Sequence, residues 1–494
     1  MKHFEYILIF LLFGSSLAAL FLHYRRLRYE QFCKLAVKAL LDKVSRIDSR
    51  FFCTYAVQEI VKLLLKSGEK KVLMQLTEGK TRAVRQFLQR KRQPLLVLLL
   101  DALANPQKTQ PRLAAFVKTD PHNLPALAAL TDLYFLNGHP AAARFCLDHL
   151  PSRSGNAYVR GLQAYYQAVF AAKEGDLLSA SQFCSLAIDA FRRSRAFFEE
   201  GRARLFMGTI YRMTAVTDTA RFMYDAAAEV YRILGFPTGI AEALGNLGML
   251  MVLEERFDEA AAYFEQALAI NRRHKLLREE AEIYNQQALL ALLQKEYKKA
   301  GQLLSLALKE HQKLQNPAGQ AFSHELQAHL FLQTQKWQKA AIAAAAAQKL
   351  YCGSPNKSAY LESHYLEAEA LFRAGEEEKA EKILRRTIAI GRKNATSFHL
   401  ANAYHLLGLI YMRRKDYLRA KGLFSQSLEQ EQKNDRLYGI AVDYANISLA
   451  NLNCGRAEEA RKTLETARDY AKASADEVLL AAIEDLIKQN FGRQ

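Results

Sequence analysis

Apolar and polar positions alternate along the chain with the period of amphipathic α-helices, and the whole pattern returns every 40 residues. One column of this repeat holds alanine eight times in succession, at residues 180, 220, 260, 300, 340, 380, 420 and 460. A small residue stands twelve positions before each alanine, and another stands seven positions after it. The pattern predicts two packed antiparallel helices per unit, with small residues facing one another so that the backbones approach closely.

These columns resemble the tetratricopeptide repeat, which has a small residue and a tyrosine on its first helix and Ala, Phe and Ala on its second. One unit that matches this signature contains Leu247, Gly248, Ala260, Phe264 and Ala267. The resemblance covers roughly residues 160 to 480, and each unit is longer than the common 34-residue form. It implies an all-α fold: an α-solenoid, a right-handed superhelix of tetratricopeptide-like helical hairpins that binds proteins or peptides.

The segments before and after the regular array differ from it in pattern, which divides the chain into five parts. The predicted parts are a transmembrane anchor at 1–24, a basic helical region at 25–110, irregular tetratricopeptide-like repeats at 111–158, eight 40-residue repeats at 159–473 and a C-terminal capping helix at 474–494.

The first part contains an uncharged stretch, residues 6–22, that is rich in Leu, Ile and Phe. Its 17 residues are at the short end of what spans a bilayer as a helix. Basic residues follow it directly, which favours a retained anchor with the bulk of the chain in the cytoplasm, as a single-pass membrane protein. The alternative is an exported scaffold whose signal peptide is cleaved near Ala18.

The basic excess is concentrated behind this stretch. The net charge of the chain is +18, and the segment from residue 25 to 118 holds 21 Lys and Arg against 7 Asp and Glu. A basic segment beside an anchor indicates contact with anionic lipid headgroups; the candidate lipid-facing residues are Arg25, Arg26, Arg28, Lys34 and Lys38. A nucleic-acid-associated regulator is the alternative that the charge suggests, but no nucleic-acid-binding motif accompanies it, so we expect no nucleic acid partner.

The sequence contains no catalytic motif that we can identify. It lacks a phosphate-binding glycine-rich loop, and its two closest histidines, His324 and His329, are spaced one residue too far apart for the H-E-x-x-H zinc motif. No two of the six cysteines have C-x-x-C spacing, which argues against a thiolate metal site. We therefore expect a protein that is not an enzyme and has no cofactor.

The functional surface implied by the tetratricopeptide resemblance is the groove lined by the first helix of each unit. Amides there can hydrogen-bond a peptide backbone, and the excess of acidic residues suggests a basic or mixed ligand. The candidate groove residues are Glu242, Asn246, Glu282, Asn285, Gln286, Glu325, Glu362, Tyr365, Glu369, Arg373, Asn402 and Arg413.

Overall fold

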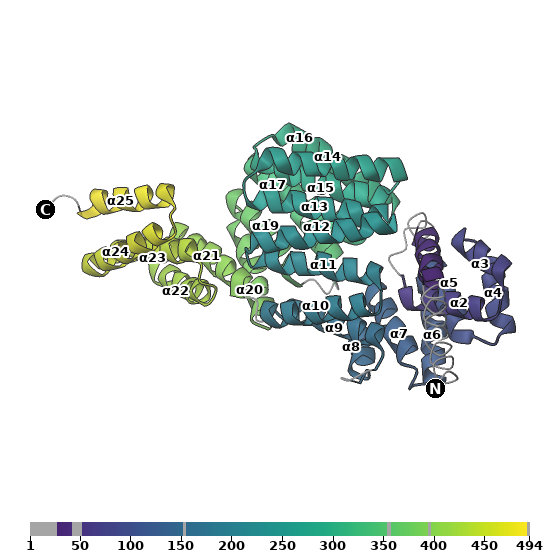
Figure 1. Cartoon of the computed structure of the whole chain (residues 1–494). Helices are drawn as coiled ribbons and strands as arrows, with labels where there is room; N and C mark the ends of the chain where they lie inside the picture. Colours follow the sequence, from purple (N-terminus) through teal and green to yellow (C-terminus); the bar gives the residue numbers. More distant parts are fainter. Residues whose placement is uncertain (1–26, 42–51, 152–154, 353–356, 394–396, 492–494) are drawn as a thin grey trace, which may run out of the picture. The chain divides into compact units, whose positions relative to one another are not determined.

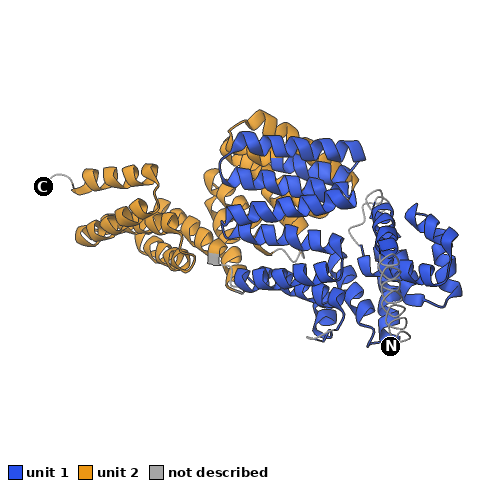
Figure 2. Ribbon diagram, viewed as in Figure 1, with its two compact units in different colours: residues 1–286 blue, residues 287–494 orange. Residues whose placement is uncertain are grey.

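The computed structural model of the chain describes residues 27–41, 52–151, 155–352, 357–393 and 397–491. All regular secondary structure in these ranges is α-helical (Figure 1). The chain divides into two compact units, residues 1–286 and 287–494 (Figure 2), and each is described by itself below. The predicted all-α helical-repeat solenoid is therefore confirmed.

The first unit begins with helices of unequal length and continues as regular pairs. After a helix over residues 27–41, the irregular helices are α2 (Thr54–Lys66), α3 (Lys70–Thr77), α4 (Thr81–Arg90), α5 (Pro94–Ala104), α6 (Pro106–Thr119), α7 (Leu124–Leu136) and α8 (Pro140–Asp148). The regular helices are α9 (Ala157–Lys173), α10 (Leu177–Arg193), α11 (Phe197–Met213), α12 (Thr217–Leu234), α13 (Pro237–Leu253), α14 (Phe257–His274) and α15 (Leu277–Leu293), which ends beyond residue 286.

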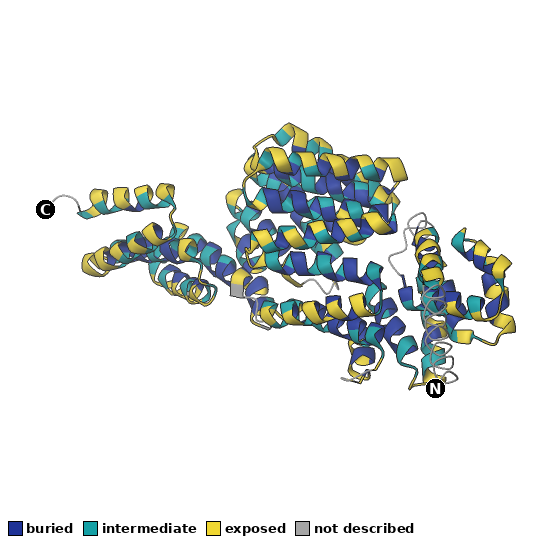
Figure 3. Ribbon diagram, viewed as in Figure 1, coloured by how far each residue is buried: buried dark blue, intermediate teal, exposed yellow. Residues whose placement is uncertain are grey.

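The second unit continues the series of paired helices. Its helices are α16 (Tyr297–Lys313), α17 (Pro317–Gln333), α18 (Trp337–Tyr351), α19 (Lys357–Arg373), α20 (Glu377–Lys393), α21 (Ser397–Arg413), α22 (Tyr417–Lys433), α23 (Leu437–Asn453), α24 (Ala457–Ala473) and α25 (Glu477–Phe491). In both units most of the apolar side chains are buried between helices, and many helices keep one side exposed (Figure 3).

Left-handed residues end most of the regular helices. The second residue after the helix terminus has a positive φ, as at Gly175 (86°) after α9 and Lys415 (62°) after α21. The next residue then caps the following helix: the side chain of Asp176 accepts a hydrogen bond from the Ser179 backbone N–H (3.0 Å), and Asp416 does the same for Arg419 (3.2 Å). Reversing the chain within three residues in this way packs consecutive helices antiparallel.

The alanine column lies at the centre of each helix pair, where all eight alanines are 0% exposed. Where the small residue twelve positions earlier is glycine, it lies against the ring four positions after the alanine: a Cβ on Gly248 would lie 2.4 Å from Phe264, and one on Gly208 would lie 2.6 Å from Tyr224. Glycine therefore makes room for an aromatic side chain.

The prediction of a single-pass membrane protein is corrected by the helices themselves. Within the described ranges, none of them combines the length and the apolar composition needed to cross a bilayer. The stretch 6–22 on which the prediction was based lies outside the described residues. Another apolar run, at residues 95–100, belongs to α5, and five of its six residues, 96 to 100, are buried in the protein.

Candidate functional site

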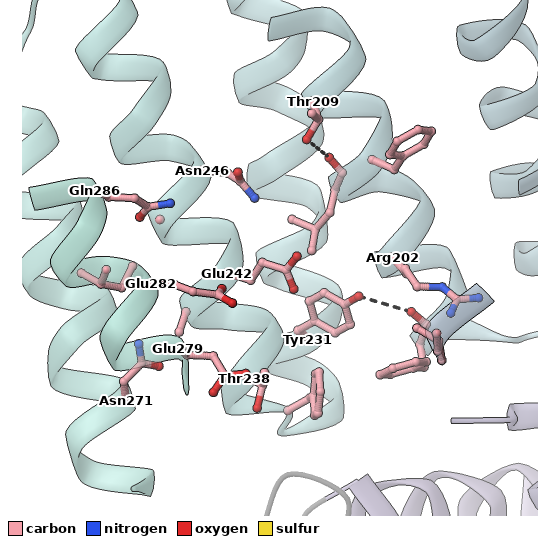
Figure 4. Close-up of a pocket in the computed structure, with 18 of the residues that line it drawn as sticks. Arg202, Thr209, Tyr231, Thr238, Glu242, Asn246, Asn271, Glu279, Glu282 and Gln286 are labelled. Atoms are coloured by element: carbon pink, nitrogen blue, oxygen red, sulfur yellow. Dashed lines mark hydrogen bonds between the residues drawn. The ribbon is translucent and has the colours of Figure 1, made fainter. Parts of the chain in front are cut away.

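A pocket of about 380 Å³ lies on the first-helix face of the first unit. Helices α11, α13 and α15 contribute most of its lining, and α7, α9, α12 and α14 contribute one residue each. Four predicted groove residues line it, namely Glu242, Asn246, Glu282 and Gln286. Figure 4 shows Glu242 on α13 and Glu282 on α15 projecting toward the same space.

The pocket exists because one position departs from the pattern of the preceding helix pairs. Asn271 stands 40 residues after Tyr231 and 80 after Phe191, both of which are buried aromatic residues. The ring of Tyr231 fills the slot beside Gly239, where a Cβ would lie 2.4 Å from the ring. An asparagine is much shorter than a tyrosine, so the corresponding space beside Asn271 is left open.

Asn271 also supplies hydrogen-bonding capacity to the pocket that it lines. Its side chain is 0% exposed, and neither its amide oxygen nor its amide nitrogen has a hydrogen-bond partner. A buried amide without partners costs free energy unless a ligand or water satisfies it. Beside it, Glu279 stands where the preceding pair has Gly239, and it is 9% exposed.

The charge of the pocket is dominated by carboxylates. Glu242, Glu279 and Glu282 all line it, together with one arginine, Arg202. Arg202 donates to Asp132 Oδ1 (2.8 Å) and stacks on the Tyr165 ring, 4.6 Å from its centroid. Burial alone would lower the pKa of Arg202, but the Asp132 carboxylate outweighs it and holds that pKa above the ordinary value. The pocket therefore favours a cation.

The apolar side of the pocket is aromatic. Its walls include the rings of Tyr165, Phe198, Phe206, Tyr231 and Phe236. Burial raises the pKa of Tyr165 to about 12, although Arg202 opposes this shift, so its hydroxyl is neutral at physiological pH. Neutral rings next to carboxylates suit a ligand with both an apolar and a cationic part.

The other predicted groove residues are distributed differently. Asn285 is buried (2% exposed) and is not among the residues that line the pocket. In the second unit, Glu325 accepts a hydrogen bond from the Tyr351 hydroxyl (3.1 Å), and Glu362 lies 3.4 Å from His399 Nδ1. These carboxylates lie on neighbouring first helices, α17 and α19, and form a second acidic region.

Several of the predicted residues interact with one another or with the turns. Arg373 pairs with Glu369 (3.1 Å), and burial raises the pKa of Tyr365 beside them. Asn402 is partly buried on α21. Arg413 stacks on Phe372, 3.9 Å from the ring centroid, and thus stabilises helix packing.

The candidate basic residues fall in or next to the helix over residues 27–41. Arg25 and Arg26 lie outside the described residues, whereas Arg28, Lys34 and Lys38 are exposed. Arg28 lies over the Phe32 ring at 5.8 Å, and the methylene carbons of Lys38 pack against Gly235 at the end of α12.

Sequence reasoning missed Asn271 and Glu279, because it searched only the first-helix positions that the resemblance implies. Asn271 is on a second helix, and Glu279 falls at a position that is glycine in the preceding pair. The sequence does contain the information for Asn271, because the two preceding positions of its column, Phe191 and Tyr231, are aromatic. Glu279 carries no such signal, since its column contains both Glu199 and Gly239.

Fold and pocket together define a helical-repeat solenoid with a polar recess on its first-helix face. Comparison with known families identifies the repeats: residues 102–165 and 199–273 each match a family model described as tetratricopeptide repeat. The chain thus contains tetratricopeptide repeats, as the sequence predicted. Comparison with curated proteins gives no match.

Solved structures of the same fold class resemble the chain at low sequence identity. Yeast Tom70 is 13% identical over 87% of this chain and 97% of its own, with a TM-score of 0.46. A signal-transduction ATPase with a tetratricopeptide repeat sensor from Pyrococcus horikoshii is 13% identical over 79% of this chain and 70% of its own, at 0.47. A Rap protein complexed with competence and sporulation factor is 13% identical over 71% and 99%, at 0.43.

Proposed function

We propose that this protein is a tetratricopeptide-repeat scaffold, built from 40-residue variants of the repeat, that binds a protein partner through the acidic pocket of its first unit. The pocket holds a basic side chain, lysine or arginine, of a peptide segment of that partner. The repeat family supports protein recognition as the general role, and the pocket supports the choice of ligand.

The observation that carries this proposal is the combination of three carboxylates with an aromatic wall. The methylene chain of a lysine or arginine packs against rings such as Tyr231 and Phe236, while its charged end meets Glu242 and Glu282. The open amide of Asn271 lies within the same pocket and is able to hydrogen-bond the ligand. An anionic ligand would meet net repulsion there.

Selection from a displayed random-peptide library on the whole protein tests the proposal. We expect enriched peptides to share a lysine or arginine, and the variant Glu242→Gln with Glu282→Gln to weaken their binding by roughly tenfold or more, because it removes two charges that face the ligand. Glu265→Gln on α14 is the matched control, since this exposed glutamate is not among the pocket-lining residues.

Two outcomes would contradict the proposal. One is the enrichment of peptides that have no basic residue. The other is an equal affinity of the double variant and the control for a selected peptide.

A further inference from the structure

A second surface of the first unit has the opposite chemistry. A groove of about 670 Å³ runs along α5 and α6, next to the turn that follows α4. Val97, Leu98, Ala115 and Phe116 form its apolar floor. Arg92 and Arg112 line it as well, and both are exposed. The groove thus combines an apolar floor with cationic edges.

The sequence around the groove is strongly basic. Residues 80–92 contain six Lys and Arg and no Asp or Glu. The nearby carboxylate of Asp101 is shared, because it accepts hydrogen bonds from both Arg85 (2.9 Å) and Arg112 (3.1 Å). In the described part of the chain, no ion pair forms at Arg90, Lys91 or Arg92, so their charges remain available to a partner.

The apolar floor follows from the composition of α5, which reads PLLVLLLDALA. Because this helix is apolar on all sides, any side that neighbouring helices leave uncovered exposes apolar side chains. Leu96, Leu99 and Leu100 face the protein interior, whereas Val97 and Leu98, which are also largely buried, reach the groove beside α6.

We propose that this groove docks an acidic segment of a protein partner, in which apolar side chains alternate with Asp or Glu. The apolar side chains cover Val97, Leu98 and Phe116, and the carboxylates meet Arg92 and its basic neighbours. Charge complementarity selects an acidic partner. Nucleic acid fits less well, because phosphates need only the cations, and bases stack on aromatic platforms, of which the groove floor contains one, Phe116.

The surface is distinct from the acidic pocket, so a partner could be held at two sites of opposite charge. The two sites involve different helices: α4 to α6 for the groove, and α7, α9 and α11 to α15 for the pocket. The groove proposal therefore does not depend on the proposed function of the pocket.

Fluorescence anisotropy with the full chain and a labelled synthetic peptide of glutamates and interspersed leucines tests this inference. Two substitutions in the groove are expected to leave the fold intact. Arg92→Gly removes a charge at a residue whose φ is 54°, a backbone conformation that glycine adopts readily. Ala115→Glu places a negative charge at an exposed position of the groove.

We expect Arg92→Gly to weaken binding roughly two- to fivefold, because it removes one exposed charge contact. We expect Ala115→Glu to weaken binding roughly tenfold, because it introduces a charge that repels the acidic peptide. The matched controls are Arg82→Gln on α4 and Ala141→Glu on α8, which are exposed residues outside the groove lining. Equal effects of the groove and control variants would overturn the proposal. So would tighter binding of a duplex DNA of equal charge that competes with the peptide, or unchanged affinity for a peptide with serine in place of leucine.

Discussion

The pairing of glycine with an aromatic ring across each helix pair leads to a quantitative prediction for Gly248→Ala. In an open helix this substitution is stabilising by about 1 kcal/mol, because alanine is the better helix former. At Gly248 the new Cβ would lie 2.4 Å from Cε1 and 2.7 Å from Cδ1 of Phe264. The Phe264 ring is itself 0% exposed, so it is enclosed by protein.

The expected change in the free energy of unfolding is the difference between the gain in helix propensity and the cost of overpacking. Overpacking a buried site costs typically about 1–3 kcal/mol, which exceeds the gain in helix propensity. We therefore expect Gly248→Ala to lower the free energy of unfolding by roughly 1–2 kcal/mol. Gly422→Ala on α22 is the control: a Cβ there meets nothing within 4 Å, so the same substitution should be stabilising by about 0.5–1 kcal/mol.

Local stability is best measured by native-state amide hydrogen exchange in α13 and α14, because repeat arrays need not unfold in one step. A rescue experiment sharpens the test. The next pair combines Ala288 with Leu304, so Phe264→Leu should restore the space that Gly248→Ala removes. We expect a coupling energy of about 1–3 kcal/mol in the double-mutant cycle. The reasoning is refuted if Gly248→Ala is as stabilising as Gly422→Ala, or if the two effects simply add.

Two more predictions concern buried charges. Burial raises the pKa of Glu325 to about 7; the Glu362 carboxylate adds to this shift and the hydrogen bond from Tyr351 opposes it. The folded state therefore favours the protonated carboxyl. The stability that this proton contributes is present below the unfolded pKa of 4.5 and is lost as the pH rises through 7. The free energy of unfolding of Glu325→Gln should therefore rise, relative to that of the unsubstituted chain, by up to roughly 2–3 kcal/mol between about pH 5 and pH 8. Urea unfolding of the two proteins measures this, and parallel pH profiles of their stability would contradict it. Removing the charge of Asp132, which is 1% exposed, leaves Arg202 buried without its counter-ion, so Asp132→Asn should cost roughly 3 kcal/mol. Thermal unfolding should show a larger loss of stability for Asp132→Asn than for the control Glu174→Gln. The exposed ion pair of Glu174 with Arg144 contributes less than about 1 kcal/mol.

Most of the helix architecture follows from local rules that the sequence displays directly. The alanine column identified a buried contact within each pair, and Gly175–Asp176 and Lys415–Asp416, a residue with positive φ followed by a capping aspartate, lie at helix boundaries. Local patterns of this kind fix helix length, capping and the buried face. What they did not reveal is which side chain fills the space beside a small residue, since this depends on contacts between helices.

The candidate site was predictable only in part for the same reason. The resemblance placed Glu242, Asn246, Glu282 and Gln286 on one face, and the structure brings these four residues to one pocket. It also placed Asn285 there, which is buried instead, because a shift of one residue rotates a side chain by about 100° around the helix axis. Arg413 is held by Phe372 near a turn, a contact between helices that position within one helix does not reveal.

In this chain the repeat columns that pack each helix pair are different from the positions that form the pocket. Where a ring is present, as at Phe264 and Phe424, the facing residue is glycine; where the second position holds a smaller side chain, as at Leu304, the facing residue is alanine. This matching keeps each pair filled, so it preserves stability without creating a cavity. Asn271 belongs to a different column, that of Phe191 and Tyr231: there the aromatic volume is lost, a carboxylate stands at position 279 where the preceding pair has Gly239, and the space is left open rather than refilled. A substitution that leaves a buried amide without partners is destabilising on its own. Its presence where four polar residues of the first helices line one pocket supports the proposal of a ligand that restores the missing hydrogen bonds.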